Sequence, residues 1–324
     1  MGSPEDVVAP LSQLHAKGPA LGLELVAVVS QPARPSGRGG KLADPPVAVF
    51  ATSKGVSCLQ PESAKSAGFL EELRKIKPDV IVTAAYGQIL SEEFLAIPQI
   101  GTINIHPSRL PEYRGATPVP AALLDGLQST SVTILFTVKK LDAGNIILQK
   151  DFSIEPSETS GQLTARLFAA SGEMLLEALT KLKKEPGFKG IPQEDAKATF
   201  CKKIDKDMGL IDWTLDAETL VNRFRAFEPW PGSWTSQADR RIAITDMGMA
   251  ETIQPSNGRP GEFKFDKPSK SIVVSCGQGQ VSVRRLKPAG AKDMDAPSFW
   301  NGLKDKTQMI FLASTPVSAG VINS

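Results

Sequence analysis

The stretch Gly101-Thr-Ile-Asn-Ile-His-Pro-Ser-Arg-Leu-Pro111 is a short strand pattern that ends in polar side chains and a proline-marked loop. Ile103 and Ile105 fall on one face of a strand, and Asn104 and His106 fall on the other, because side chains alternate with period two. Open parallel sheets place their ligands at the carboxyl ends of strands. Asn104 and His106 are therefore candidate catalytic residues, although the same pair at a strand end can also simply cap a turn.

Apolar runs of strand type alternate with helical patterns on both sides of this stretch. The predicted strands are Leu23–Val29, Val47–Phe50, Asp79–Ala85, Ile100–Ile105, Ile146–Phe152 and an alternating series from Val132 to Val138. Helices are predicted over Phe69–Ile76, after the capping residue Ser91, and over Leu163–Leu182. Strands that alternate with helices are typical of an α/β fold with a doubly wound, mostly parallel sheet.

The length of 324 residues favours two domains over one. Residues 1–184 carry the α/β pattern, and residues 185–204, rich in Pro and Gly, are expected to form a linker. Residues 205–324 begin with a helical pattern and continue with short strand-like runs separated by Gly, Pro and Asn. That spacing predicts a small β-barrel.

Composition excludes several classes of protein. No apolar run approaches the roughly 20 residues that span a bilayer, so no membrane association is expected. The three cysteines lie far apart without metal-ligand spacing, which predicts reduced thiols and no metal site. A net charge of +2 is too small for a strong overall attraction to nucleic acid. Any RNA contact must come from a local patch.

Several motifs together identify a family. Asn104-Ile-His106, Ser108–Pro111, Arg114-Gly-Ala-Thr-Pro118 and Leu141-Asp-Ala-Gly144 resemble the formyltetrahydrofolate-dependent formyltransferases. Two further stretches, Gln31–Leu42 and Arg225–Gly232, are similar to those of the methionyl-tRNA formyltransferases. The resemblance implies a Rossmann-like formyltransferase fold followed by an OB-like barrel that binds tRNA. It also implies 10-formyltetrahydrofolate as co-substrate and initiator methionyl-tRNA as acceptor, with a product used in translation initiation.

Formyl transfer to an amine passes through a tetrahedral intermediate whose oxygen needs hydrogen-bond donors. Asn104 can supply an amide donor, and protonated His106 can supply a charged one. The resemblance makes Asp142 the acidic partner that orients the imidazole or accepts a proton. Taken without the family, Asp142 is better explained as a turn residue ahead of Gly144.

The resemblance also assigns binding residues. Folate is expected to contact Ser108, Leu110 and Pro111, with Arg109 departing from the usual Leu, and a second segment made of Ala85, Tyr86, Gly87, Gln88, Ile89 and Leu90. Arg34, Arg38 and Lys41 are expected to contact tRNA from a Gly-rich loop, in which Ala33 replaces the usual Asp. From sequence alone, each of these segments could be an ordinary surface loop.

In the family, a buried strand precedes a turn that Gly2-Ser-Pro4 resembles, so the resemblance implies that the first β-strand is lacking. We therefore expect a truncated organelle enzyme, mitochondrial before plastid, with a bacterial-type cytoplasmic enzyme as the alternative. A monomer is the simplest assembly. Two other functions stay open. One is a relative that formylates a nucleotide sugar or a purine precursor, or hydrolyses formylfolate. The other is an inactive fragment that only binds folate or tRNA.

Overall fold

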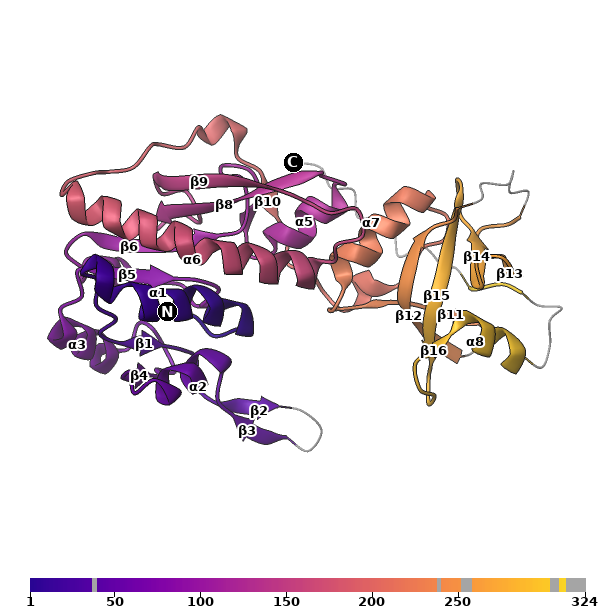
Figure 1. Ribbon diagram of the computed structural model, residues 1–324, viewed down its shortest axis with the longest axis horizontal. Coiled ribbons are helices and arrows are strands. Elements are labelled where there is room, and N and C mark those ends of the chain that lie inside the picture. Colours follow the sequence, from indigo (N-terminus) through magenta and orange to yellow (C-terminus); the bar gives the residue numbers. More distant parts are fainter. Residues whose placement is uncertain (37–39, 238–239, 252–257, 304–308, 313–324) are drawn as a thin grey trace. The chain divides into compact units, whose positions relative to one another are not determined.

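The computed structural model describes residues 1–36, 40–237, 240–251, 258–303 and 309–312. The chain forms two compact units (Figure 1). The first unit contains Met1–Pro118, Ser129–Ile154 and Gln162–Lys202, and the second contains Val119–Gln128, Glu155–Gly161 and Lys203–Ser324.

The first unit is built on a four-stranded sheet in the order β5-β6-β8-β9. Its strands are β5 (Val80–Thr83), β6 (Gly101–His106), β8 (Ser129–Phe136) and β9 (Ile146–Ser153). β5 and β6 are parallel, whereas β8 is antiparallel to both β6 and β9. The predicted α/β class is confirmed. The two antiparallel pairs of this sheet both involve β8, and its connection to β9 is short enough to join antiparallel neighbours.

Within the described residues, the first unit contains five α-helices beside its sheets, and α2 packs against the pair β1 and β4 described below (Figure 1). They are α1 (Val8–Lys17), α2 (Pro46–Ser53), α3 (Ala67–Ile76), α4 (Glu92–Leu95) and α6 (Ser160–Lys184), while α5 (Pro118–Leu124) lies mostly in the second unit. The predicted cap is confirmed, since Ser91 Oγ accepts a hydrogen bond from Phe94 N at 3.2 Å. The strand predicted at Val47–Phe50 is wrong. These residues lie in α2, whose first turn starts at a proline, and a short apolar run does not distinguish a buried strand from a buried helix.

A second small sheet lies beside the first. β1 (Val28–Val29) pairs in parallel with β4 (Cys58–Leu59), and β1 is much shorter than the strand predicted over Leu23–Val29. Met1 and Gly2 lie between β1 and β5: Gly2 N donates to Val29 O at 3.0 Å, and Ala84 N donates to Met1 O at 2.9 Å. Beyond these two residues, the facing edges of β1 and β5 have no strand between them in the described part of the chain. The residues before Val28 therefore have no neighbour on that side with which to extend the strand.

Two further short pairs belong to the first unit. β2 (Arg34–Ser36) and β3 (Lys41–Ala43) are antiparallel, and β7 (Arg114–Gly115) is parallel to β10 (Phe200–Cys201). The segment predicted as a linker thus pairs with the first unit through β10, and the chain enters the second unit at Lys203. Among the described helices, none combines the length and apolar composition that crossing a bilayer requires.

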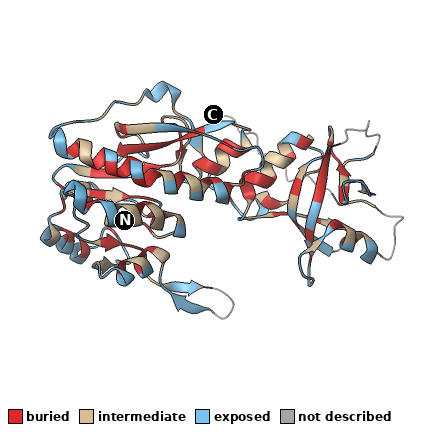
Figure 2. Cartoon of the chain, viewed as in Figure 1, coloured by how far each residue is buried: buried red, intermediate tan, exposed pale blue. Residues whose placement is uncertain are grey.

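The second unit contains an antiparallel sheet together with α7 (Ala217–Phe227), α8 (Ala296–Gly302) and most of α5. Its strands are β11 (Ser233–Gln237), β12 (Arg240–Met249), β15 (Gln280–Pro288), β14 (Ser271–Ser275) and β13 (Phe263–Asp266), with β16 (Met294–Asp295) paired to β15. The described residues 309–312 bridge both sheet edges, through Leu312 to Ser236 and Ile310 to Glu262. This closure makes the predicted small barrel, whose buried interior (Figure 2) includes the stacked rings of Trp213, Phe263 and Phe311.

Candidate active site

His106 lies at the end of β6, with only 4% of its surface exposed. Its Nε2 is 3.0 Å from Tyr113 O, and a carbonyl oxygen can only accept, so Nε2 carries a proton. The second ring nitrogen is Nδ1. It lies 3.8 Å from Asp142 Oδ2, which is within ion-pair range but too long for a hydrogen bond. When Nδ1 carries a proton, the two side chains form an ion pair.

Asn104 lies two residues before His106, on the same face of β6. Its Oδ1 accepts a hydrogen bond from Thr83 Oγ1 at 2.9 Å, and Thr83 is its direct register partner on β5. Because Oδ1 is the acceptor in this contact, Nδ2 is the atom that can donate to a substrate oxygen. Sequence reasoning missed Thr83, since nothing in the sequence fixes the register between two strands.

Asp142 is held by the backbone of the loop that joins β8 and β9. Its φ angle is +46°, a left-handed conformation that is uncommon for residues other than glycine. Oδ2 accepts a hydrogen bond from Gly115 N at 2.8 Å, which turns the carboxylate towards His106. Gly144 allows the loop to fold this tightly, because a Cβ there would lie 1.7 Å from Phe136 O.

Two residues that sequence reasoning missed hold the same loop in place. Gln193 Nε2 donates to Asp142 O at 2.8 Å and to Gly144 O at 2.7 Å. Gln193 Oε1 in turn accepts from Nη2 and Nε of Arg114, at 2.7 and 3.2 Å. The guanidinium of Arg114 is fully buried and also contacts Asp195 Oδ1 at 2.8 Å. This chain of contacts connects the predicted linker to the backbone of the candidate catalytic carboxylate.

In the predicted folate loop, Ser108 and Leu110 point inward, whereas Arg109 is exposed and pairs with Asp151 at 2.8 Å. Ser108 Oγ donates to Glu112 O at 2.8 Å, and Leu110 is only 2% exposed. Leu110 and Pro111 line a cavity of about 280 Å³ together with Gln149, Gln193, Lys197 and others. The main chain of Ser108 is bonded as well, since its N–H donates to His106 O at 3.0 Å and its O accepts from Thr133 Oγ1 at 2.7 Å, so fully buried Ser108 supports the loop from within.

The second predicted folate segment starts directly after β5. Ala85 and Gly87 have φ angles of +43° and +78°, so the chain turns sharply around Tyr86. The Tyr86 ring is buried, and burial raises the pKa of its hydroxyl to about 12. Gln31 Nε2 donates to Tyr86 O at 2.8 Å and fixes this turn from the neighbouring strand.

The remaining residues of this segment differ in exposure. Gln88 Oε1 accepts from Ala64 N at 2.7 Å, and Leu90 packs partly buried against the core. Ile89 is 80% exposed. Residues 85–90 form neither helix nor strand, so their peptide groups are not committed to a regular ladder. Such main-chain groups suit a ligand edge that carries several donors and acceptors.

The predicted tRNA loop is part of a hairpin. Arg34 on β2 and Lys41 on β3 are both exposed, and Arg34 pairs with Ala43 in the antiparallel register. The third predicted cation, Arg38, lies outside the described residues. Within the described residues, no group of three or more His, Cys, Asp or Glu side chains is placed to hold a metal ion.

Two family models match the chain. One, described as formyl transferase, matches residues 2–179, and the other, described as formyl transferase C-terminal domain, matches residues 203–304. The chain belongs to the formyl transferase family. The first match covers β5, β6 and the loop of Asp142, which together carry the candidate catalytic residues.

Relatives of known name cover almost the whole chain. A methionyl-tRNA formyltransferase of Alkaliphilus metalliredigens is 37% identical over 303 residues, 93% of this chain and 94% of the relative. One of Listeria monocytogenes is 39% identical over 308 residues, 93% of this chain and 94% of the relative. Among solved structures, an N-formyltransferase of Helicobacter canadensis in complex with folinic acid and dTDP-3-aminofucose superposes with a TM-score of 0.64. At 15% identity over 87% of this chain and 96% of that one, the likeness supports the formyltransferase fold.

Proposed function

We propose that this chain transfers a formyl group from 10-formyltetrahydrofolate to the α-amino group of initiator methionyl-tRNA. The observation that carries the proposal is the short distance of 3.8 Å between His106 Nδ1 and Asp142 Oδ2. Asn104 lies on the same face of β6 as His106. The identity of 37–39% to proteins named methionyl-tRNA formyltransferase, over nearly their whole length, supports this acceptor.

Asn104 and protonated His106 would stabilise the charge that develops during the reaction. The acceptor nitrogen forms a bond to the formyl carbon, and the formyl oxygen takes up negative charge. Nδ2 of Asn104 and the Nδ1 proton of His106 then donate to that oxygen. One well-placed donor of this kind lowers the barrier by about 3 kcal/mol.

Asp142 and His106 would carry out the proton transfers of the reaction. The Asp142 carboxylate accepts the proton that the attacking amine loses, directly or through one water. His106 gives its Nδ1 proton to the folate nitrogen as the bond from that nitrogen to the formyl carbon breaks. The products are the formylated amine and tetrahydrofolate. A proton then passes from Asp142 to His106 and restores the starting state.

The two substrates would be bound by different segments of the chain. Main-chain groups of Ala85–Leu90 fit the donors and acceptors of a pterin ring, and the loop Ser108–Pro111 would border the folate. Arg34 and Lys41, with Arg38, supply cations for the acceptor end of tRNA. We infer a monomer from the sequence. The relatives reported above are bacterial and give no support to the expected organelle location, so the bacterial-type cytoplasmic alternative is favoured.

The test is formylation of initiator methionyl-tRNA by the purified chain, with 10-formyltetrahydrofolate as donor. An amino sugar nucleotide and the folate donor without an acceptor are run in parallel. Transfer to methionyl-tRNA that disappears in the His106→Ala variant is the expected result. Transfer to the amino sugar alone, or release of formate without an acceptor, would overturn the choice of acceptor.

A further inference from the structure

Two backbone groups of one short segment hold both candidate catalytic side chains. Tyr113 O accepts the hydrogen bond from His106 Nε2 at 3.0 Å, and Gly115 N donates to Asp142 Oδ2 at 2.8 Å. The residues Tyr113 and Gly115 are separated by Arg114 alone. The conformation of residues 113–115 therefore determines where His106 and Asp142 lie relative to each other.

This segment has an uncommon backbone. Tyr113 has a φ angle of +57°, in the left-handed region that residues other than glycine rarely adopt, and Gly115 has a φ angle of +121°. Such conformations persist only where surrounding contacts hold them. The segment contains the two residues of β7, whose strand partner is β10. Thr199, the residue before β10, supplies two of the contacts that hold Tyr113.

Thr199 binds two successive N–H groups of the segment. Its hydroxyl oxygen accepts a hydrogen bond from Tyr113 N at 2.8 Å, and its carbonyl oxygen accepts one from Arg114 N at 2.9 Å. The Arg114 N–H and the Tyr113 carbonyl belong to the same planar trans peptide group, so they point in opposite directions. Because this N–H points to Thr199, the carbonyl points away from Thr199 and towards His106 Nε2.

The next peptide group is held in the same way by Cys201. Its Sγ donates to Arg114 O at 3.2 Å, and the Gly115 N–H of that peptide points the opposite way, to Asp142 Oδ2. Position 115 needs a glycine for β10 to approach this closely, since a Cβ there would lie 2.8 Å from Cys201 O. Thr199 and β10 thus contact directly the backbone that holds the candidate catalytic pair.

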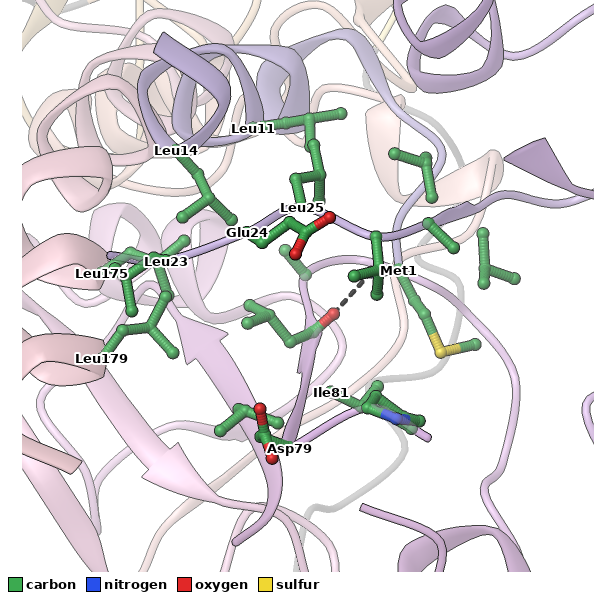
Figure 3. A pocket seen from close by; sticks show the side chains of 18 of the residues that line it. Met1, Leu11, Leu14, Leu23, Glu24, Leu25, Asp79, Ile81, Leu175 and Leu179 are labelled. Atoms are coloured by element: carbon green, nitrogen blue, oxygen red, sulfur yellow. Dashed lines mark hydrogen bonds between the residues drawn. The ribbon is translucent and has the colours of Figure 1, made fainter. Parts of the chain in front are cut away.

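These contacts are separate from the apolar cavity of about 560 Å³ in the first unit (Figure 3). Leu11 and Leu14 of α1 and Leu175 and Leu179 of α6 contribute to its walls. Thr199 is not among the described residues that line it. A substitution of Thr199 is therefore expected to act on the backbone of residues 113–115 and not on the apolar packing around this cavity.

We propose that Thr199 is a positioning residue of the candidate active site. Its hydroxyl fixes the backbone of Tyr113, and the Tyr113 carbonyl in turn keeps the ring proton of neutral His106 on Nε2, with Nδ1 facing Asp142. The ring nitrogen that donates must carry the proton, so this contact selects one of the two tautomers of neutral imidazole. Thr199 itself contacts no substrate. The expected effect on formyl transfer rests on the proposed function, whereas the effect on the ring does not.

The test compares two substitutions of Thr199 with a matched control. Thr199→Val keeps the shape of the side chain and loses the oxygen, whereas Thr199→Ser keeps the oxygen. Thr199 is exposed, so both variants should fold, and Thr199→Ala is a second variant without the hydroxyl. Thr117→Val is the control, because Thr117 Oγ1 donates to Lys202 O at 2.6 Å, next to β10, and does not bind the backbone of Tyr113.

The tautomer of His106 is read by ¹⁵N NMR of the full chain with labelled histidine, at a pH where the ring is neutral. The chain has two histidines, His15 and His106, so His15→Gln assigns the signals. We expect the proton on Nε2 in the unmodified chain, in Thr199→Ser and in Thr117→Val. Thr199→Val and Thr199→Ala should each give a mixture of the two tautomers.

The second readout is single-turnover formyl transfer to methionyl-tRNA. Thr199→Val should lower its rate at least about 10-fold with unchanged affinity for both substrates, because small displacements of a reacting group are costly in rate. A single Nε2–H tautomer in Thr199→Val, or an unchanged rate with a mixed one, would overturn the proposal. Equal changes in Thr117→Val would also overturn it, since they would indicate a general loosening of β10. If the unmodified chain did not formylate methionyl-tRNA, the proposed function would fail, and the tautomers would still decide the role of Thr199.

Discussion

Replacing Gln193 with leucine should impair catalysis through the position of Asp142, although Gln193 is not proposed to touch a substrate. The substitution removes the two donors that hold Asp142 O and Gly144 O. Each such bond contributes about 1 kcal/mol to the free energy of unfolding. It also removes the acceptor of Arg114, a charged contact that contributes about 1.5–3 kcal/mol. The expected loss of stability is therefore about 4 kcal/mol.

In molecules that stay folded, this loss of stability does not by itself slow the reaction. We therefore expect any loss of rate to come from a displaced Asp142. A displacement of about 1 Å at a reacting group can cost about 100-fold in rate. Single-turnover formylation of methionyl-tRNA, measured well below the melting temperature of the variant, should show this loss in the rate constant of the chemical step. The exposed residue Gln128 provides a matched control, because Gln128→Leu should change neither the melting temperature nor the rate.

The substitution Gln193→Glu distinguishes the effect of the amide donor from that of the acceptor oxygen. The carboxylate still accepts from Arg114 but no longer donates to the loop that contains Asp142. We expect a smaller loss of stability than with leucine and the same loss of rate. If both variants lowered the melting temperature but left the chemical step unchanged, Gln193 would be a structural residue only, and the reasoning on Asp142 would be refuted.

Three further predictions concern the carboxylate, the amino terminus and the hairpin. Asp142→Asn keeps an acceptor for Gly115 N, so it should lower kcat at least about 100-fold with little change in thermal stability; unchanged kcat would remove Asp142 from the mechanism. Between pH 5 and pH 8 the unfolded Met1 amine binds a proton and the folded one does not, so stability should rise with pH, by about 4 kcal/mol for a pKa lowered from 8.0 to about 5. Urea unfolding of the chain and of its acetylated form measures this rise, and identical pH profiles would contradict it. Arg34→Ala and Lys41→Ala should each weaken tRNA binding and reduce its salt dependence without changing folate affinity, as read from binding titrations at several salt concentrations.

The sequence predicted the parts of the site that lie on one strand. Alternation along β6 was enough to place Asn104 and His106 on one face, because the side-chain period of a strand does not depend on its neighbours. Asp142 was assigned only through the family resemblance. Its left-handed backbone and its contact with Gly115 depend on how a loop folds back, and a local pattern does not encode that.

Residues that act across elements were not predictable. Thr83 reaches Asn104 only because β5 and β6 adopt one particular register. Gln193 lies in a segment whose Pro and Gly content indicated a linker, yet its side chain binds two backbone carbonyls of the loop that contains Asp142. The helix α2 was misread because its apolar run has no helical periodicity that a strand could not also show.

Strand β5 positions two parts of the candidate site. Thr83 at its end orients Asn104, because its hydroxyl donates to Asn104 Oδ1 at 2.9 Å. Two residues later, Ala85 has a φ angle of +43° and begins the segment proposed to border the pterin ring. Because β5 and β6 pair in one register, a shift of that register would displace the amide of Asn104 relative to the start of this segment.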